Sequence, residues 1–349
     1  MKTSKKILVF NAGSTSLKYQ LFQANNLKVL KKNDWQNLTS DSDHLKAFQK
    51  ILKEISSFTN IQVVGHRLVH GGDKFYQPTL INRQIIKEIE KFNSLAPLHN
   101  PAQLKILTWA QKYLPTNHLA VFDTAFFTNL PLKAKIYALP LKYYKKHRIQ
   151  KFGFHGISHQ YVAQQAAQKM KKKLSTINLI TCHLGGGCSV AAIKKGKAID
   201  TSMGFTPLEG LVMMTRPGDL DPGLGFYLYQ KLGLSLKEVN NLFNFESGIK
   251  GLWGSQDFKK LLAAVKKRDK KAQLAFDIFI YRLQKYLSAY QGVLGKVQGV
   301  VFTGAIGSGD PYTVKKIKQG LPWLSQVKIL RIKTEEEKAI AQECKKFIK

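Results

Sequence analysis

Residues 181–223 read TCHLGGGCSVAAIKKGKAIDTSMGFTPLEGLVMMTRPGDLDPG, and this stretch is informative because it carries two signals for phosphate chemistry. Apolar runs at 178–182 and 188–193 predict buried strands on either side of Gly185-Gly186-Gly187. Glycines there let backbone N–H groups approach a polyphosphate that side chains would exclude. The stretch then places Arg216 in a Pro-Gly turn, and a phosphate loop followed by an arginine is typical of phosphoryl transfer. A plain tight hairpin is the alternative interpretation of the glycines.

The beginning of the chain repeats this pattern without repeating the sequence. Residues 7–10 and 17–22 predict two short strands, and small amide and hydroxyl residues form the turn between them at 11–16. The order of strand, phosphate-sized polar turn and strand therefore occurs once in each half of the chain. Two such hairpins that face each other would grip a nucleotide from both sides.

Segments with strand and helix spacing alternate along the rest of the chain, which indicates an α/β fold. Further strands are predicted at 63–72, 119–122 and 300–302, and helices at 43–57, 82–95, 102–114, 159–173, 224–232, 235–243, from 257 onward with a second run at 272–294, 313–319 and 335–348. Residues 247–255 and 304–307 are expected to be glycine-rich loops. We place a domain boundary near Ile149, after a proline-containing stretch without strong periodicity.

The composition is that of a globular protein with ordinary cores. A length of 349 residues suggests two domains, and 44% of the residues are hydrophobic. No apolar run approaches the roughly 18 residues that span a bilayer, and the one near the N-terminus is too short for a signal peptide. Cys182, Cys188 and Cys344 have neither metal nor disulfide spacing. We therefore expect a cytoplasmic protein with reduced thiols and no membrane association.

The net charge of +33, from 55 Lys and Arg against 22 Asp and Glu, is extreme. Such a charge attracts any polyanion without specificity, including nucleic acid. The lysines are scattered, however, and no RNA- or DNA-binding motif surrounds them. We interpret the charge as a solvated surface whose field also favours an anionic substrate, and we expect no specific nucleic-acid partner.

Ten stretches resemble the acetate kinases, in that family's order and over nearly the whole chain. They read VFNAGSTSLKYQLF, GHRLVHGG, LAPLHNP, FDTAFF, GFHGISH, HLGGG, TSMGFTPLEG, TRPGDLDPG, AFDIFIYRLQKY and VFTGAIG. The resemblance implies the fold shared with actin, Hsp70 and sugar kinases, which is two actin-like (ribonuclease H-like) α/β domains with a nucleotide cleft between them. One domain would comprise residues 1–149 joined by the C-terminal helix 336–349, and the nucleotide-binding domain would comprise 150–335.

Acetate kinases transfer phosphate reversibly between ATP and acetate. The resemblance therefore implies ADP and acetyl phosphate as products, a step of acetyl-CoA biosynthesis, with Mg²⁺ (alternatively Mn²⁺) and a homodimer. A propionate or butyrate kinase of the same family, which would differ only in pocket size, is one alternative. A basic binding protein on a decayed kinase scaffold is the other, and retention of five functional positions argues against it: Asn11, Arg67, Asp123, His155 and Arg216.

The resemblance also implies catalytic roles. Arg67 and Arg216 match the family's two essential arginines, whose guanidinium groups suit carboxylate and phosphoryl oxygens, although a structural ion pair is the alternative for each. His155 matches the histidine that stabilises the transferring phosphoryl group, and Asp123 matches a catalytic aspartate. Because acetate is already ionised at neutral pH, we expect Asp123 to orient groups or contact metal-bound water rather than to act as a base.

Further positions match binding residues. Asn11 and Glu336 match the residues linked to magnesium, which prefers hard oxygen ligands. The residues implied to bind acetate are Arg67, Val69, Leu98, His99, Phe154 and Pro207. Those implied to bind the nucleotide are Ser14, Ser16, Lys18, His183, Leu184, Gly185, Gly186, Gly187, Asp257, Phe258, Lys259, Gly304, Ala305, Ile306 and Gly307. The apolar members of the acetate set would fit an ordinary core equally well.

Departures from the family pattern lie on the nucleotide side. Gly186 stands where the family usually has Asn, Ser308-Gly309 where it usually has Glu-Asn, and Lys259 where an arginine often follows Asp257. The chain is also shorter than is typical, near 23–60 and 308–335. We therefore expect nucleotide affinity to differ from the family more than the chemistry does.

Overall fold

The computed structural model describes residues 4–97 and 99–348, and within them the chain divides into two compact units. Unit 1 comprises the described residues of Met1–Thr128, His155–Tyr161 and Glu335–Lys349, and unit 2 those of Asn129–Phe154 and Val162–Thr334. No helix in the described part of the chain is long and apolar enough to cross a lipid bilayer.

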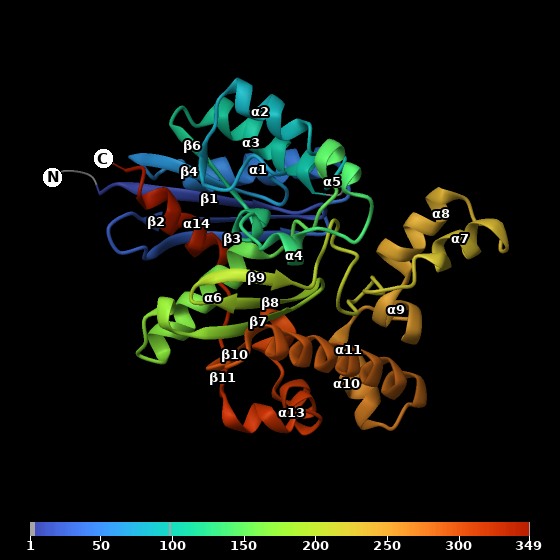
Figure 1. The fold of residues 1–349 in the computed structure, drawn as a ribbon. Coiled ribbons are helices and arrows are strands. Elements are labelled where there is room, and N and C mark those ends of the chain that lie inside the picture. Colours follow the sequence, from blue (N-terminus) through green and yellow to red (C-terminus); the bar gives the residue numbers. More distant parts are fainter. Residues whose placement is uncertain (1–3, 98, 349) are drawn as a thin grey trace. The chain divides into compact units, whose positions relative to one another are not determined.

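Unit 1 is built on a six-stranded sheet (Figure 1). Its strand order is β3 (Val29–Gln36), β2 (Ser16–Gln23), β1 (Lys6–Ala12), β4 (Ile61–Leu68), β6 (Asn117–Phe122) and β5 (Thr79–Leu80). β2 pairs antiparallel with both β1 and β3, whereas β4 pairs in parallel with β1, and β6 in parallel with β4. The predicted polar turn at 11–16 joins the first two strands.

Helices cover both faces of this sheet, so its central strands are apolar without alternation. They are α1 (Asp41–Ile55), α2 (Arg83–Glu90), α3 (Asn100–Tyr113) and α14 (Glu336–Lys345). Successive side chains of β1 point to opposite faces, so Phe10 packs with α1 and α3 while Val9 packs with α14. Gly65 lets α14 approach closely, because a Cβ atom there would lie 2.6 Å from Ile340 Cγ2 and 2.7 Å from Cys344 Sγ.

Unit 2 repeats this connectivity on a five-stranded sheet (Figure 1). Its strand order is β11 (Lys328–Arg331), β10 (Gly299–Thr303), β7 (Asn178–Leu184), β8 (Cys188–Lys194) and β9 (Lys197–Thr201). β7, β8 and β9 are antiparallel, β10 pairs in parallel with β7, and β11 in parallel with β10. These are the relations among β1, β2, β3, β4 and β6, so the doubled hairpin pattern is confirmed as a doubled sheet topology.

Unit 2 contains several helices, of which the long helix α11 packs against β7, β8, α9, α10 and α13. They are α4 (Leu132–Lys135), α5 (Leu141–His147), α7 (Gly223–Gln230), α8 (Leu236–Asn241), α9 (Gly248–Trp253), α10 (Phe258–Lys266), α11 (Lys270–Leu294), α12 (Gly304–Gly307) and α13 (Pro311–Gln319). α6 (Gly156–Lys169) begins in unit 1 and continues in unit 2.

Two predicted glycine-rich loops are helical, and those predictions are wrong. Residues 247–255 contain α9, and residues 304–307 form the single turn of α12. Glycine weakens a helix, which is why its abundance favoured loops. The first turn of α9 is stabilised from outside, because Ile249 N–H donates to the Met213 carbonyl at 3.0 Å and Lys250 N–H to the Met214 carbonyl at 2.9 Å. The other predicted helices and strands are present with shifted ends.

Candidate active site

Side-chain alternation brings three of the predicted functional residues together in unit 1. Asn11, Arg67 and Asp123 lie at the carboxyl ends of β1, β4 and β6, and each follows, at an even spacing, residues that pack with α14. The carboxyl ends of neighbouring parallel strands meet at one edge of a sheet, where α/β proteins collect ligands. The three side chains therefore converge beside the first turn of α14.

The Arg67 guanidinium contacts acceptors from three elements. Nε and Nη2 donate to Asp123 Oδ2 at 3.1 and 2.6 Å, and Nη1 donates to Asn11 Oδ1 at 3.2 Å and lies 3.1 Å from Glu336 Oε2. Burial alone would lower the pKa of Arg67, but the carboxylates of Asp123 and Glu336 outweigh burial and hold that pKa above its usual value. A structural ion pair, the alternative interpretation for this arginine, is therefore present. A catalytic role for Arg67 stays a prediction.

Three consecutive glutamates at the start of α14 differ in their hydrogen-bond partners. Asn11 Nδ2 donates to Glu336 Oε2 at 3.3 Å and to Glu337 Oε1 at 2.7 Å. Glu335 instead accepts a 2.5 Å hydrogen bond from the Tyr161 hydroxyl. Glu336 and Glu337 thus face the cluster around Arg67, and Glu337 is a member that the sequence did not single out. Carboxylates are also stabilised at this position by the dipole of the helix N-terminus.

The donors in this cluster fit a divalent cation. Asp123, Glu336 and Glu337 carry three negative charges against the single positive charge of Arg67, and Asn11 adds an amide oxygen. The described residues contain no preformed group of three acidic, His or Cys ligands that could hold a metal alone. Magnesium seldom needs one, because it keeps several waters and uses one or two carboxylates together with substrate phosphates.

The residue after His155 is a glycine that packs closely against the backbone of Asp123. A Cβ atom on Gly156 would lie 2.0 Å from the Asp123 carbonyl oxygen, so only glycine permits this approach of the two backbone segments. His155 itself has φ of +58°, a left-handed conformation that is uncommon outside glycine and recurs at functional sites. Burial raises the pKa of the Asp123 carboxyl, and Arg67 partly offsets that effect.

Val69 and His99, two of the unit 1 residues predicted to bind acetate, contact Gln103, whose amide is buried. Val69 N–H donates to Gln103 Oε1 at 2.9 Å, and Gln103 Nε2 donates to the Ala12 carbonyl at 3.0 Å. His99 is half-buried and immediately precedes α3, and Leu98 lies outside the described residues. Gln103 thus ties the ends of β1 and β4 together. Sequence reasoning missed it, although a glutamine just after LAPLHNP in an apolar helix was a usable signal.

In unit 2 the three glycines form the turn that the sequence predicted. Gly185 N–H donates to the Gly187 carbonyl at 3.0 Å across the end of the β7–β8 hairpin. A Cβ atom on Gly186 would meet nothing within 4 Å, so this glycine is open to its surroundings. Gly304 has φ of +76° and packs against the Leu184 backbone, where a Cβ atom would lie 2.4 Å from the carbonyl oxygen. The two predicted phosphate segments, 183–187 and 304–307, are therefore neighbours.

Arg216 differs from Arg67 in having no acidic partner among residues 4–97 and 99–348. Among these described residues, its guanidinium makes one hydrogen bond, from Nη1 to Met213 Sδ at 3.9 Å, which is a weak interaction. Burial lowers the pKa of Arg216, while its interaction with Cys188, at the end of the glycine turn, opposes that shift. The ion-pair alternative is thus absent for Arg216 within the described residues, and a partly buried cation stands near the predicted phosphate turn.

Phe154 and Pro207, both predicted for the acetate pocket, lie in segments of unit 2 that are hydrogen-bonded to each other. Phe154 is buried, and the chain just before it bonds to the segment that carries Pro207. Phe152 and Gly153 N–H groups both donate to the Gly204 carbonyl, at 3.0 and 3.2 Å. The contribution of these residues to an acetate site stays a prediction.

Several residues predicted to bind the nucleotide have structural partners. Lys18 Nζ forms an ion pair with Asp34 Oδ2 on β3, at 3.1 Å. Asp257 caps α10 by accepting hydrogen bonds from the backbone N–H groups of Lys259 and Lys260, at 2.9 and 3.1 Å. Phe258 is buried against α11. Ser14 and Ser16 lie in or next to the β1–β2 turn. Their contacts with a nucleotide stay predictions.

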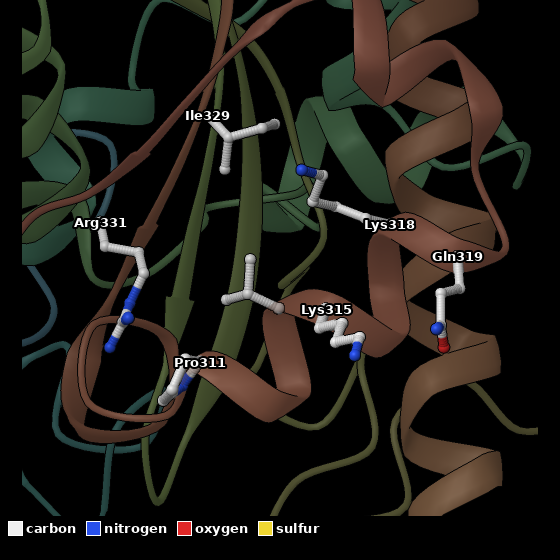
Figure 2. A pocket seen from close by; sticks show the side chains of 7 residues that line it. Pro311, Lys315, Lys318, Gln319, Ile329 and Arg331 are labelled. Atoms are coloured by element: carbon white, nitrogen blue, oxygen red, sulfur yellow. The ribbon is translucent and has the colours of Figure 1, made fainter.

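A hollow of about 460 Å³ lies between α13 and β11, and none of the residues predicted for the site lines it (Figure 2). Its lining combines apolar and basic residues: Pro311, Val314, Lys315, Lys318, Gln319, Ile329 and Arg331. Arg331 Nη2 donates to the Ser308 carbonyl at 2.5 Å, so β11 fastens the segment in which the sequence departs from the acetate kinases. A Cβ atom on Gly309 would lie 2.2 Å from the Ala305 carbonyl oxygen, so that segment requires glycine.

The duplicated sheets and the glycine turn define a kinase of the two-domain, actin-like α/β fold. Solved structures agree with this class. The acetate kinase of Porphyromonas gingivalis matches with a TM-score of 0.90, 34% identity and coverage of 99% of this chain and 100% of that one. A propionate kinase of Francisella tularensis matches with a TM-score of 0.90, 35% identity and coverage of 97% and 98%.

Sequence comparison gives the family. Residues 6–324 match the model of the acetokinase family. The acetate kinase of Thermotoga petrophila is 39% identical over 397 aligned positions, which cover 98% of each chain. The chain therefore belongs to the acetokinase family.

Proposed function

We propose that the protein is an acetate kinase, which transfers the γ-phosphoryl group of ATP to acetate and gives ADP and acetyl phosphate. One observation carries the proposal beyond family membership. Arg216 is a partly buried guanidinium without an acidic partner among the described residues, and it stands near a glycine turn suited to phosphates. Withdrawing an unpaired charge from water is unfavourable on its own, so this arrangement favours an anionic ligand.

The transfer requires no proton movement. A carboxylate oxygen of acetate attacks the γ-phosphorus, and the bond from that phosphorus to the β–γ bridging oxygen breaks, so that ADP leaves with the electron pair. Arg216 and His155 would neutralise charge on the transferring oxygens. Asp123 already holds Arg67 through two N–H groups, which supports a role in orientation rather than as a base. Apolar residues would contact the acetate methyl group: Val69, Leu98, Phe154 and Pro207.

A divalent cation, Mg²⁺ with Mn²⁺ as the alternative, would be held by Asn11 and Glu336, and Glu337 adds a further carboxylate. When bound, the ion would neutralise charge on the phosphate oxygens of the nucleotide. The excess of carboxylates over cationic groups around Asn11 supports this assignment. The same excess argues against a free anion binding there without a metal.

The protein is also proposed to be a homodimer in solution. Large apolar side chains are exposed on and beside α7 and α8, which pack together: Leu220, Leu224, Phe226, Tyr227, Tyr229, Leu232 and Leu236. Phe226 is 65% exposed and Leu236 is 73% exposed. Apolar patches of this extent on a soluble protein commonly mark interfaces. Sedimentation of the native protein and of Phe226→Glu tests the proposal, since a dimer that survives this substitution places the interface elsewhere.

A propionate kinase is the second candidate, because the Francisella tularensis protein of that name matches as well as the acetate kinase from Porphyromonas gingivalis. One assay separates these candidates and the binding-protein alternative. ADP release is measured with acetate, propionate or butyrate, and hydroxylamine traps the acyl phosphate. We expect trapped product with acetate at the highest kcat/KM. ATP binding without trapped product from any of the three acids would favour the binding protein.

A further inference from the structure

The segment that carries Arg216 is a loop closed at its base. Gly210 N–H donates to Asp219 Oδ1 at 2.7 Å, and Asp219 N–H donates back to the Gly210 carbonyl at 3.0 Å. Gly210 and Gly218 have φ of +106° and +72°, and added Cβ atoms would strike backbone at both positions. The base of the loop therefore consists of two glycine bends that one aspartate holds together.

The second carboxylate oxygen of Asp219 fastens the loop to α11. Asp219 Oδ2 accepts a 2.8 Å hydrogen bond from the Tyr286 hydroxyl and lies 3.3 Å from Arg282 Nη1. Arg282 Nη1 also donates to the Asp219 carbonyl at 3.1 Å. Burial and the neighbouring Asp219 raise the pKa of Tyr286, so its phenol stays a donor at neutral pH. Asp219 thus joins both ends of the loop to the longest helix of unit 2.

The tip of the loop is fixed from the other side. Ser247 N–H donates to the Thr215 carbonyl at 3.1 Å, and Met214 N–H donates to the Gly186 carbonyl at 3.2 Å. The Arg216 carbonyl accepts a hydrogen bond from Met213 N–H at 2.9 Å. The backbone around Arg216 is therefore tied to α9 and to the glycine turn, whereas its guanidinium makes a weak contact with the Met213 sulfur.

We propose that Asp219 is a positioning residue that sets the location of the Arg216 guanidinium relative to the glycine turn, with Tyr286 and Arg282 as its supports. This proposal rests on the proposed function, in which Arg216 stabilises the transferring phosphoryl group. Asp219 acts through the loop, because its carboxylate is engaged by Gly210, Tyr286 and Arg282. Because a displacement of about 1 Å can lower an enzymatic rate by about 10²-fold, a loop released at its glycine bends would lose rate.

Two substitutions test the proposal at different strengths. Asp219→Asn preserves size but places an amide against Arg282, and we expect kcat to fall by about 10- to 100-fold, with KM for ATP changed by less than about threefold. Tyr286→Phe removes a single hydrogen bond, and we expect a fall in kcat of about 3- to 10-fold.

Tyr19→Phe is the matched control, because it removes a part-buried tyrosine–carboxylate hydrogen bond of 2.6 Å to Glu54 in unit 1. It should destabilise the fold similarly and leave kcat unchanged.

The decisive measurement repeats Asp219→Asn and Tyr286→Phe in an Arg216→Ala background, with thermal unfolding recorded for every variant. If Asp219 acts through Arg216, both substitutions lose their effect on kcat once Arg216 is absent. If the same fold-loss appears in both backgrounds, or if Asp219→Asn leaves kcat unchanged, the positioning role is wrong while the proposed function stands. If Arg216→Ala alone costs tenfold or less, the proposed role of Arg216 fails, and the positioning role with it.

Discussion

Arg67 and Arg216 match two arginines of one predicted function, yet unit 1 and unit 2 give them opposite surroundings. Arg67 is bound by Asp123, Asn11 and Glu336, and its acidic neighbours raise its pKa. Arg216 has no acidic partner among the described residues, and burial lowers its pKa. Two residues with the same side chain are therefore prepared for different ligands.

The difference predicts the sign of charge of the ligand that suits the surroundings of each arginine. The acidic surplus around Arg67 suits a cation, and a bound cation would draw Glu336 from the guanidinium and release Arg67 for an anion. Arg216 suits an anion without any rearrangement. Arg67 also contributes to the stability of unit 1, because it neutralises a carboxylate that is 1% exposed, whereas we expect Arg216, which has no acidic partner among the described residues, to affect function alone.

Arg67→Ala is expected to give the largest effect, because it removes both contributions. Its kcat should fall by about 10³-fold or more, as for other arginines that clamp a phosphoryl group. The free energy of unfolding should also fall by about 3–5 kcal/mol, since Asp123 would be left buried without its partner. Urea unfolding and the coupled assay measure the two effects. Unchanged stability would mean that Asp123 is not charged in the folded protein.

Arg216→Ala should lower kcat as much as Arg67→Ala does, but it should not lower the free energy of unfolding in the same way. We expect a fall of about 10³-fold or more in kcat and a change in the free energy of unfolding of less than about 1 kcal/mol. Arg268→Ala, at an exposed arginine of unit 2, is the control and should change neither quantity. A destabilisation by Arg216→Ala as large as that of Arg67→Ala would remove the distinction between the two arginines.

Much of this comparison could be predicted from the sequence. The doubled strand-turn-strand pattern, the glycine turn and the positions of both arginines follow from hydrophobic spacing and from the resemblance. Side-chain parity in β1, β4 and β6 would also have placed Asn11, Arg67 and Asp123 on one face. The division into domains near Ile149 stays a prediction.

Other parts were beyond sequence reasoning because tertiary contacts decide them. β3 and β11 are polar edge strands, VLKKNDWQ and KILR, that alternate too weakly to be recognised. α9 begins at glycine and depends on carbonyls of the Arg216 loop for its first hydrogen bonds. The partners of Arg67 and of Asp219 are also remote in sequence, since Arg67 contacts Glu336 and Asp219 contacts Tyr286.

Acidification should weaken unit 1 through its buried histidines. Burial lowers the pKa of His66 and His118, and it lowers the pKa of His70 to about 4. Because the unfolded chain takes up these protons near pH 6.5, the stabilisation is full above that pH and is lost as the pH falls toward 4. His70 alone would cost about 2 kcal/mol at pH 5. Urea unfolding of a Trp253→Phe/Trp323→Phe variant, whose remaining tryptophans lie in unit 1, measures the effect. A midpoint independent of pH between 8 and 5 would contradict it.

The smallest expected effect concerns Gly186 and Gly309, two positions in unit 2 at which the sequence departs from the family pattern. An asparagine at Gly186 would enter open space and could donate to a phosphate, so we expect Gly186→Asn to lower KM for ATP by about threefold to tenfold at similar kcat. Gly309→Asn should instead raise KM, because its Cβ atom would strike the Ala305 carbonyl. An unchanged or higher KM in Gly186→Asn would show that the turn has been rebuilt around glycine.

A magnesium titration of kcat in Glu336→Gln and Arg216→Ala tests the division between cation and anion most directly, with Glu335→Gln as the control from the same helix turn. We expect Glu336→Gln to raise the magnesium concentration for half-maximal rate by about 10- to 100-fold and to recover much of its kcat at saturation. Arg216→Ala should keep the native magnesium requirement and stay slow at every concentration. An Arg216→Ala rate that magnesium restores, or a Glu336→Gln titration that matches the native one, would contradict the account.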